Sequence, residues 1–321
     1  MNHQFKIVFA DYDYPSIDIE LEQLAKIDAD ITEGQCKTEE DVIELARDAD
    51  GIICQYAPFT EKVIQQLNRC QIIARYGVGV DNIDIEAATK KGIKVAYVPD
   101  YCTEEVSNHA VAMIMNFARQ ISLLERSTRN KKWDVLISKP IFRLSEQTVG
   151  IFGLGRIGKS VAQKLQRFGV TLIANDPYIS RTLPGVQRVD FNTLLAESDY
   201  ITIHAPLNAE TRHTFDRKAL TRMKKDAFLI NTARGGIVDQ AALFDAMARK
   251  EIKGAALDVL EKEPPDWRQV PHLDNLIITP HTAFYSESSY QELKRRTAHS
   301  VVKALNGQVV TDLFNPEVLN Q

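Results

Sequence analysis

The sequence predicts an α/β protein with two doubly wound, parallel-sheet domains. Three observations lead to this prediction. Short apolar runs typical of buried strands alternate with amphipathic, helix-like segments along almost the whole chain. A glycine-rich stretch with dinucleotide-binding spacing begins at Gly153, in the middle of the chain rather than near its start. The chain has 321 residues, enough for two domains of about 150 residues each.

The first predicted domain is discontinuous. Its strand-like runs are KIVFA, DGIIC, CQIIARYG and IKVAYVP. Helix-like segments at 17–29, 39–48 and 60–69, and a short one in DIEAATKKG, separate these runs. A last helix is expected at 286–305, and the tail 286–321 is too short to fold alone. We therefore expect the first domain to combine residues 1–98 with 286–321.

Residues 99–285 form the second predicted domain. One long helix is expected from Thr103, over TEEVSNHAVAMIMNFARQISLLERSTR, because a threonine and two acids precede apolar residues at helical spacing. Six strand-like runs follow, in TVGIF, TLIAND, YITIHAP, AFLINTA, GAALDV and LIITP. Their alternation with helix-like segments indicates a nucleotide-binding, doubly wound domain of the Rossmann type.

The stretch GLGRIG at 153–158 has the G-x-G-x-x-G spacing of a dinucleotide-binding turn. Gly153 allows the tight turn, Gly155 lets the backbone approach a pyrophosphate, and Gly158 lets helix and strand pack closely. A strand precedes the turn and a helix follows it, which argues against an incidental glycine loop. The next strand ends in Asp176, whose carboxylate can accept hydrogen bonds from ribose hydroxyls and would repel a 2′-phosphate. The predicted cofactor is therefore NAD rather than NADP.

Three reactive side chains each follow a different strand-like run, at the edge where open α/β sheets bind ligands. They are Arg234 in NTARGGIVD, Glu263 in LDVLEKEPP and His281 in TPHTAFY. An arginine can hold a carboxylate with two hydrogen bonds, and a histidine beside a glutamate can donate a proton to a carbonyl oxygen. This set suits the reduction of a 2-oxo acid. The competing interpretations are a loop cap, a solvated acid and a packed histidine, respectively. His109 is interpreted as structural.

Composition and termini exclude several classes of protein. A net charge of −4 without a long basic run argues against nucleic acid as a partner. The four cysteines form no CxxC pair, so neither a metal site nor a disulfide framework is indicated. The N-terminus lacks the features of a signal peptide, and no apolar run reaches the roughly 20 residues that a membrane helix needs. We expect a cytoplasmic protein without a membrane partner.

Six motifs occur together and in order: RYGVGVDNID, GLGRIG, HAPLNAETRH, NTARGGIVD, LDVLEKEPP and TPHTAFYS. This series resembles the D-2-hydroxyacid dehydrogenases, NAD-dependent enzymes whose nucleotide domain is inserted into a flavodoxin-like substrate domain. The resemblance implies hydride transfer between NAD(H) and a 2-hydroxy acid/2-oxo acid pair. It implies Arg234 as the carboxylate anchor, His281 as the general acid and Glu263 as its partner.

The resemblance also carries binding roles to further positions. It implies that the cofactor is bound by Gly153, Gly155, Arg156, Ile157, Gly158, Asp176, Ala205, Thr232, Ala233, Arg234, Asp258 and His281. It implies that the substrate is bound by Arg75, Val78, Gly79, Arg234 and His281. Arg156 and Ile157 would contact the pyrophosphate through their backbone amides, and those of Val78 and Gly79 would bind the substrate carboxylate.

Within the family, VPDYCTEEVSNHA and TPHTAFYSE are most similar to dehydrogenases related to the C-terminal-binding protein corepressors, although Phe284 stands where that subgroup usually has tryptophan. One alternative is a D-3-phosphoglycerate dehydrogenase. In CQYAPFTEK, however, only Lys62 is a nearby cation for a phosphate, so we favour a 2-oxo acid with an apolar or thioether tail. Another alternative is an idle, NAD-sensing protein-interaction module. The resemblance implies a homodimer, with 129–142 as a candidate exchanged arm unless Trp133 belongs to the core.

Overall fold

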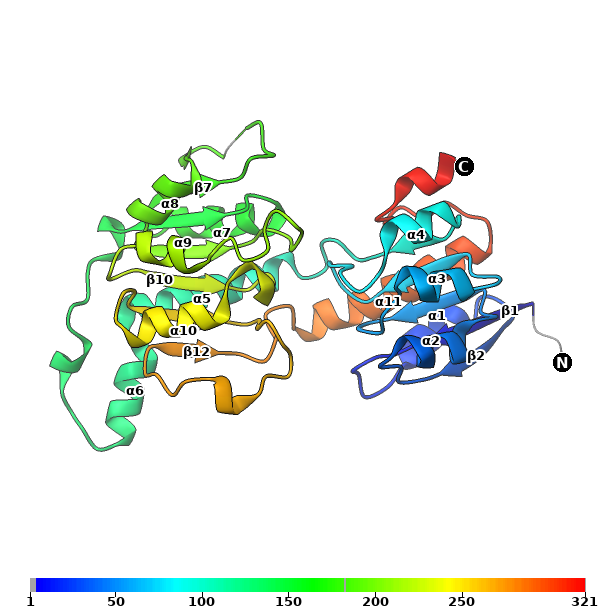
Figure 1. Cartoon of the computed structure of the whole chain (residues 1–321), viewed down its shortest axis with the longest axis horizontal. Coiled ribbons are helices and arrows are strands. Elements are labelled where there is room, and N and C mark those ends of the chain that lie inside the picture. The colour runs from blue at the N-terminus through cyan, green and yellow to red at the C-terminus, as the bar shows by residue number, and fades with distance from the viewer. Residues whose placement is uncertain (1–3, 182, 321) are drawn as a thin grey trace. The chain divides into compact units, whose positions relative to one another are not determined.

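The computed structural model describes residues 4–181 and 183–320. The chain divides into two compact units. The first unit contains the residues up to Tyr101 and those from Ser286 onward, and the second unit is Cys102–Tyr285. Each unit is built on one parallel sheet, of five and seven strands respectively (Figure 1). The predicted fold class, α/β with two parallel sheets, is confirmed.

The sheet of the first unit has the order β2-β1-β3-β4-β5, which is the flavodoxin-like order. Its strands are β1 (Phe5–Phe9), β2 (Ala29–Glu33), β3 (Gly51–Cys54), β4 (Ile72–Arg75) and β5 (Lys94–Ala96). The inner strand β3 is buried along its whole length, as expected for a strand with helices on both faces of the sheet.

Helices cover both faces of this sheet. They are α1 (Asp18–Leu24), α2 (Glu39–Ala46), α3 (Glu61–Gln66), α4 (Ile85–Lys90) and α11 (Glu287–Leu305), followed by the 3₁₀ turn η5 (Pro316–Asn320). One core holds apolar side chains of α2, α3 and α4. The other holds those of α1 and α11, so the last long helix completes the fold of the chain's beginning (Figure 1).

The sheet of the second unit has the order β12-β11-β10-β9-β6-β7-β8. Its strands are β6 (Thr148–Phe152), β7 (Thr171–Asn175), β8 (Val186–Arg188), β9 (Tyr200–Ile203), β10 (Phe228–Asn231), β11 (Gly254–Leu257) and β12 (Leu276–Ile278). Read from β8, the first six strands follow the 3-2-1-4-5-6 order of dinucleotide-binding folds, and β12 adds a seventh. The strand order reverses at β6, which leads into the glycine turn.

Helices of the second unit lie between these strands and before them. They are α5 (Thr103–Arg119), α6 (Ile121–Arg129), α7 (Arg156–Gln166), α8 (Phe191–Glu197), α9 (Arg217–Arg222) and α10 (Gln240–Ala248). Four 3₁₀ turns complete the unit: η1 (Val135–Ser138), η2 (Leu144–Glu146), η3 (Gly235–Ile237) and η4 (Trp267–Gln269). Several short helices begin with an aspartate whose side chain accepts a hydrogen bond from the third helical amide, as Asp239 does for α10.

The predicted single helix from Thr103 is wrong, because it is interrupted at Gln120. That residue adopts a left-handed conformation with φ +53° and separates α5 from α6. Side chains replace the helical hydrogen bonds at this point. The Gln120 side-chain amide donates to the Phe117 carbonyl (3.0 Å), and Asn116 Oδ1 accepts from the Ser122 backbone amide (2.9 Å).

Two edge strands were missed in the sequence. The strand β2 lies where the helix at 17–29 was expected to end, but α1 stops at Leu24. Its acidic residues Asp30 and Glu33 are poor strand formers, and they are tolerated because β2 pairs on one side only. The strand β8 has three residues and lies at the other sheet's edge, too short to give a periodic pattern.

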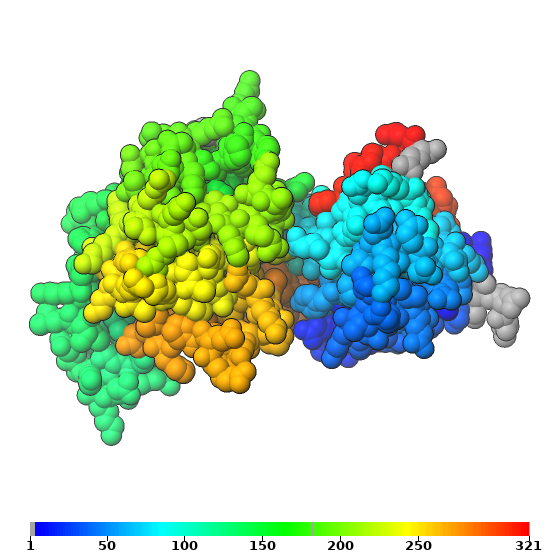
Figure 2. Space-filling view, in the orientation of Figure 1, coloured from blue at the N-terminus to red at the C-terminus, as the bar shows by residue number. Residues whose placement is uncertain are grey.

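Residues 129–142 form an exposed arm in the second unit. Trp133 is 93% exposed, so the interpretation of this side chain as core is wrong. Val135, Leu136 and Phe142 are also exposed. The arm belongs to the segment that is coloured blue-green in Figure 2. Within residues 4–181 and 183–320, no helix combines the length and apolar character needed to span a bilayer.

Candidate active site at the carboxyl edge of the seven-stranded sheet

Six strands of the second unit end at the same level. Register pairs align Asn175, Phe152, Ile203, Asn231, Leu257 and Ile278 across the sheet. The residues that follow them are Asp176, Gly153, His204, Thr232, Asp258 and Thr279. Four of these six are predicted cofactor-binding residues. The parallel sheet therefore gathers side chains from distant parts of the sequence along one edge.

The glycine turn has the geometry that its spacing predicts. Gly153 has φ +90°, and a Cβ there would lie 2.6 Å from the Ala205 amide nitrogen. A Cβ on Gly158 would lie 2.1 Å from the Gly153 carbonyl oxygen, so helix α7 packs directly on the turn. A Cβ on Gly155 would meet no atom within 4 Å. Open space therefore lies at the start of α7, where the backbone amides of Arg156 and Ile157 begin the helix and favour an anion.

Asp176 is fastened to this turn. Its Oδ2 accepts a hydrogen bond from the Leu154 amide (2.8 Å), and its Oδ1 accepts one from the Tyr178 amide (2.9 Å). Each oxygen of an ionised carboxylate can accept about two hydrogen bonds. Both oxygens therefore keep capacity for ribose hydroxyls.

Two buried polar atoms at the ends of β9 and β10 have no hydrogen-bond partner among the described residues. They are His204 Nδ1 and Thr232 Oγ1. Burial lowers the pKa of His204 to about 3, so its ring is neutral, and Nε2 pairs with Thr202 Oγ1 at 2.9 Å. Buried polar groups are normally satisfied, and a ligand amide could supply the missing partners. The glycine turn, Asp176 and these atoms all fit a dinucleotide.

Asp258 braces the turn that carries His281. The Asp258 carboxylate is buried, and its Oδ1 accepts hydrogen bonds from the Thr279 hydroxyl (2.5 Å) and the Thr282 amide (2.9 Å). Its Oδ2 accepts from the Ala283 amide (2.9 Å). The His281 amide donates to the Asp258 carbonyl (2.8 Å).

His281 has φ +50°, a conformation that non-glycine residues rarely adopt. The hydrogen bonds to Asp258 hold the turn in this conformation. Strained backbone at functional sites usually depends on such support.

Thr279 and His109 belong to this brace; the sequence analysis did not name Thr279, and it interpreted His109 as structural without foreseeing its partner. Thr279 Oγ1 lies 3.1 Å from His109 Nε2. Because Thr279 gives its single hydroxyl proton to Asp258, it must accept from His109, which therefore carries a proton on Nε2. The signal for Thr279 was present, since it follows β12 directly. His109, on α5, gave no such signal.

His281 and Glu263 form a pair. His281 Nδ1 lies 2.6 Å from Glu263 Oε2, and the side chains are 34% and 35% exposed. Glu263 Oε1 accepts from the Leu260 amide (2.8 Å), which fixes the carboxylate. Burial raises the pKa of the Glu263 carboxyl. Other contacts outweigh burial and bring this pKa below its usual value: the hydrogen bond and charge of His281, the Leu260 amide and the charge of Arg234. The carboxylate is therefore ionised at neutral pH, and Nε2 is the ring nitrogen left to exchange a proton.

Arg234 lies between β10 and η3, in the same unit as this pair. Its Nη1 donates to the Ala233 carbonyl (2.8 Å), and the Asn231 side chain holds the Arg234 carbonyl (2.9 Å). Asn231 also accepts from the Ala233 amide (3.0 Å), which shapes the Thr232–Arg234 segment. A Cβ on Gly235 would lie 2.0 Å from the Leu260 carbonyl carbon, so this loop packs directly on the turn that leads to Glu263.

The remaining predicted residues, Arg75, Val78 and Gly79, belong to the first unit. Arg75 Nε donates to the Gln55 carbonyl at 3.2 Å. Within the part of the chain that the structure describes, no group accepts a hydrogen bond from the Val78 or Gly79 amide. Two neighbouring amides of this kind can donate hydrogen bonds to an anion.

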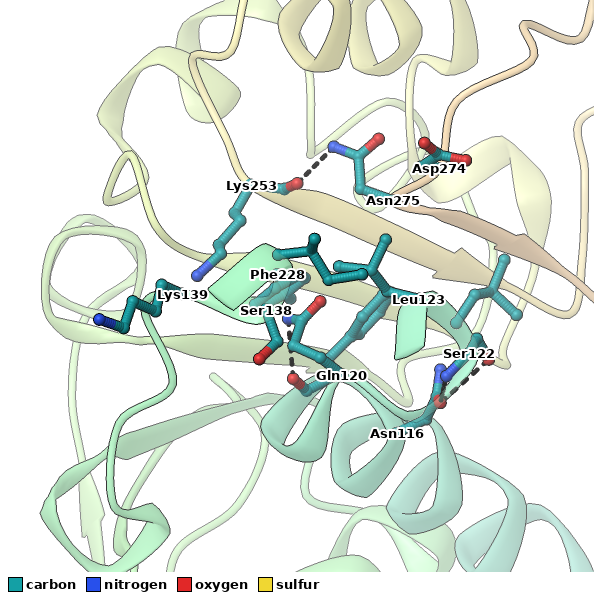
Figure 3. A pocket seen from close by; sticks show the side chains of 13 residues that line it. Asn116, Gln120, Ser122, Leu123, Ser138, Lys139, Phe228, Lys253, Asp274 and Asn275 are labelled. Atoms are coloured by element: carbon teal, nitrogen blue, oxygen red, sulfur yellow. Dashed lines mark hydrogen bonds between the residues drawn. The ribbon is translucent and has the colours of Figure 1, made fainter. Parts of the chain in front are cut away.

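The pocket in Figure 3 lies elsewhere in the second unit. Its lining includes Gln120, Ser138, Phe228 and Lys253, and none of the predicted site residues. Phe228 starts β10, so this pocket lies at the amino ends of the strands, opposite the candidate site, and partly under the arm. Among the described residues, no group of three or more His, Cys, Asp or Glu side chains could hold a metal ion.

Comparison with known proteins identifies the family. Residues 111–283 match "D-isomer specific 2-hydroxyacid dehydrogenase, NAD binding domain". The chain belongs to this family. A D-3-phosphoglycerate dehydrogenase of Methanocaldococcus jannaschii is 38% identical over 87% of the chain, and a glyoxylate reductase of Korarchaeum cryptofilum is 35% identical over 87%. The match covers 54% of the first relative and 86% of the second, so the chain spans about half the length of the phosphoglycerate dehydrogenase.

Solved structures of similar fold superpose on almost the whole chain. A D-lactate dehydrogenase of Aquifex aeolicus, complexed with NAD and lactic acid, gives a TM-score of 0.86 at 28% identity, covering 96% of this chain and 98% of that one. An acyclic imino acid reductase in complex with NADPH and D-Arg gives 0.86 at 26% identity, covering 96% and 99%. The family assignment from the sequence is confirmed. These four proteins do not carry the corepressor-like name of the finer subgroup.

Proposed function

We propose that this protein is an NAD-dependent D-2-hydroxyacid dehydrogenase that interconverts a 2-oxo acid and a 2-hydroxy acid. The observation that carries the proposal is the His281–Glu263 pair, which lies in the same unit as Arg234 and the dinucleotide turn. In this proposal residues 99–285 bind NAD, and residues 1–98 with 286–321 bind the substrate.

The three side chains have distinct roles. Arg234 holds the substrate carboxylate through its planar guanidinium. His281 Nε2 donates a proton to the carbonyl oxygen during reduction and takes it back during oxidation. Glu263 keeps the imidazole oriented and stabilises its charged form. The nicotinamide, when bound, supplies or accepts the hydride at C2.

A substrate with an apolar or thioether tail is proposed over a phosphorylated one. Lys62, the cation closest in sequence to the expected substrate loop, pairs with Glu39 (3.0 Å) and Glu40 (2.5 Å). These two carboxylates neutralise the charge that a phosphate would need. Tyr56 of the same loop is 54% exposed and offers an aromatic surface.

Oxidation of NADH across a panel of 2-oxo acids tests the function. The panel contains glyoxylate, pyruvate, branched, thioether and aromatic members, and 3-phosphohydroxypyruvate. We expect turnover, with kcat/KM highest for an unphosphorylated acid. Highest kcat/KM for 3-phosphohydroxypyruvate would favour the phosphoglycerate dehydrogenase alternative. Absence of turnover with every acid would favour the idle, NAD-sensing interaction module.

Asp176 supports a preference for NADH over NADPH. In the same assay, the Asp176→Ala variant should narrow the ratio of kcat/KM values for the two cofactors. Equal efficiency with both cofactors in the unmodified protein would contradict this assignment.

A homodimer is also proposed, and the exposed apolar arm supports it. Trp133, Val135 and Leu136 are the kind of side chains that a partner copy would cover. Sedimentation of a variant with Trp133→Ser and Leu136→Ser should then show monomers.

A further inference from the structure

A charged pair in the first unit is fully buried and has no place in the proposed chemistry. Lys294 Nζ lies 3.3 Å from Glu20 Oε2, and the two side chains are 2% and 0% exposed. Removing two charges from water is costly, and apolar residues of similar size often stabilise a fold as well. Stability alone is therefore a weak reason for this pair.

Polar and aromatic groups contact the pair. The Tyr76 hydroxyl donates to Glu20 Oε1 at 2.6 Å, and Lys294 donates to the Ser16 carbonyl. The Lys294 ammonium lies 5.4 Å from the centre of the Tyr14 ring and 5.0 Å from that of Tyr290. Both distances are within the range of cation–π attraction.

This network joins four segments of the first unit. Tyr14 and Ser16 follow β1, Glu20 lies on α1, Tyr76 follows β4, and Tyr290 and Lys294 lie on α11. The Tyr76 ring is already packed edge to face against Tyr14, with ring centres 5.2 Å apart. The hydroxyl bond to Glu20 therefore adds orientation to a ring that packing alone would bury.

Tyr76 is the first residue of the loop that contains Val78 and Gly79. The Tyr76 amide donates to the Cys54 carbonyl (2.8 Å), and the Gly77 carbonyl accepts from the Val98 amide (3.0 Å). The loop is thus fixed at its first two residues, while the amides of Val78 and Gly79 donate to no group among the described residues. The direction of those two amides depends on how Tyr76 and Gly77 are held.

We propose that Glu20 and Lys294 are positioning residues for substrate binding. They fix the Tyr76 hydroxyl, and through it they orient the Val78 and Gly79 amides toward the substrate carboxylate. This inference rests on the proposed function of those amides. Disorder in the network would weaken carboxylate binding and leave the proton transfer at His281 intact.

The Tyr76→Phe variant tests the proposal by removing one hydroxyl. We expect KM for the best 2-oxo acid to rise by about three- to tenfold, the scale of one ordinary hydrogen bond, because the lost hydroxyl acts on the carboxylate only through the orientation of the two amides. We expect kcat and the Kd of NADH to change by less than about twofold, because the effect is confined to binding of the acid. The matched control is Tyr200→Phe, which removes the hydroxyl of a buried tyrosine in the second unit.

A second variant separates positioning from stability. Lys294→Met alone leaves the Glu20 charge buried without its partner and should lower the melting temperature strongly. Combining it with Glu20→Leu removes both charges and should restore most of that loss. KM should nevertheless stay high in the double variant, because Tyr76 has lost its acceptor.

Amide exchange gives a readout that does not need turnover. The Tyr76 and Val98 amides hold the start of the loop, and their exchange should be faster in Tyr76→Phe than in Tyr200→Phe. If the unmodified protein reduces no 2-oxo acid, the proposed function fails and exchange alone decides on the network. Unchanged KM in an active Tyr76→Phe variant, or unchanged exchange in an inactive one, would overturn the positioning role.

Discussion

The two units each contain a glutamate paired with a basic side chain, but the pairs differ in exposure. In the second unit, about a third of the surface of His281 and of Glu263 remains exposed. In the first unit, Lys294 and Glu20 are buried almost completely. Both basic groups lie beside a carboxylate, and both carboxylates accept a further hydrogen bond, from the Leu260 amide and from the Tyr76 hydroxyl respectively.

The difference in exposure indicates a difference in use. A pair that a ligand can reach is able to exchange a proton with it, and histidine titrates near neutral pH when unperturbed. A buried lysine–glutamate pair cannot exchange protons readily, but its directional bonds hold the segments around it. We therefore interpret the His281–Glu263 pair as chemical and the Lys294–Glu20 pair as geometric.

Removal of the imidazole should have the largest effect. His281→Ala should lower kcat by about 10²–10⁴-fold, the usual loss for a general acid. The Kd of NADH, measured by fluorescence titration, should barely change. His272→Ala removes an exposed histidine and is the control. Near-full turnover with a collapse of NADH binding would make His281 a cofactor ligand and end the distinction between the two pairs.

Replacing each glutamate by glutamine compares the pairs directly. Glu20→Gln leaves Lys294 buried with no opposite charge, so the free energy of unfolding should fall by about 3 kcal/mol. The pH profile of kcat for reduction should keep its shape. Denaturant titration and steady-state kinetics measure the two effects separately.

Glu263→Gln should change the pH profile of kcat, which Glu20→Gln leaves unchanged. Losing the carboxylate removes a charge that favours the protonated imidazole, so the alkaline limb of the reduction profile should move to lower pH. The acid limb should move little.

Stability should respond in a defined pH window. The pKa of Glu263 is lowered on folding, so its contribution is present above the unfolded pKa of about 4.3. That contribution is lost as pH falls through the lowered folded pKa. The stability difference between the unmodified protein and Glu263→Gln should therefore shrink in acid. A profile that shifts for Glu20→Gln and not for Glu263→Gln would reverse the comparison.

Most of the candidate site at the carboxyl ends of the second unit's strands could be predicted from sequence, because each residue there directly follows a strand. Gly153, Asp176, Thr232 and Asp258 all occupy such positions. The strand register then brings them together without further information, since neighbouring parallel strands end at one level. Local spacing and one topological rule predicted Gly153 and Asp176, whereas Thr232 and Asp258 were expected only through the resemblance to the family.

The buried network of the first unit could not be predicted in this way. Glu20 and Lys294 are 274 positions apart, and each lies on a helix where a charged residue normally faces solvent. Their pairing depends on α11 packing beside α1, which is a tertiary event. The same holds for His109, whose role depends on α5 lying near Thr279. The break at Gln120 was missed because side-chain hydrogen bonds there replaced helical ones.

Of the changes to catalysis, removing one hydrogen bond from the brace behind His281 should have the smallest effect on kcat. Thr279→Val keeps the side-chain volume and removes the hydroxyl between His109 and Asp258, leaving both without that partner. Asp258 keeps its two amide bonds, so the His281 turn should loosen rather than unfold. We expect kcat to fall by about three- to tenfold, in line with the net contribution of one typical hydrogen bond, while KM stays within about twofold.

The conservative replacement makes this test selective. Thr279→Ser retains the hydroxyl and should recover most of the lost kcat. Thr297→Val is the matched control, because its buried hydroxyl donates to the Leu293 carbonyl of its own helix. If Thr279→Val and Thr297→Val lower kcat equally, the brace has no specific role. Full activity in Thr279→Val would show that the amides of Thr282 and Ala283 alone suffice to hold Asp258 and the His281 turn.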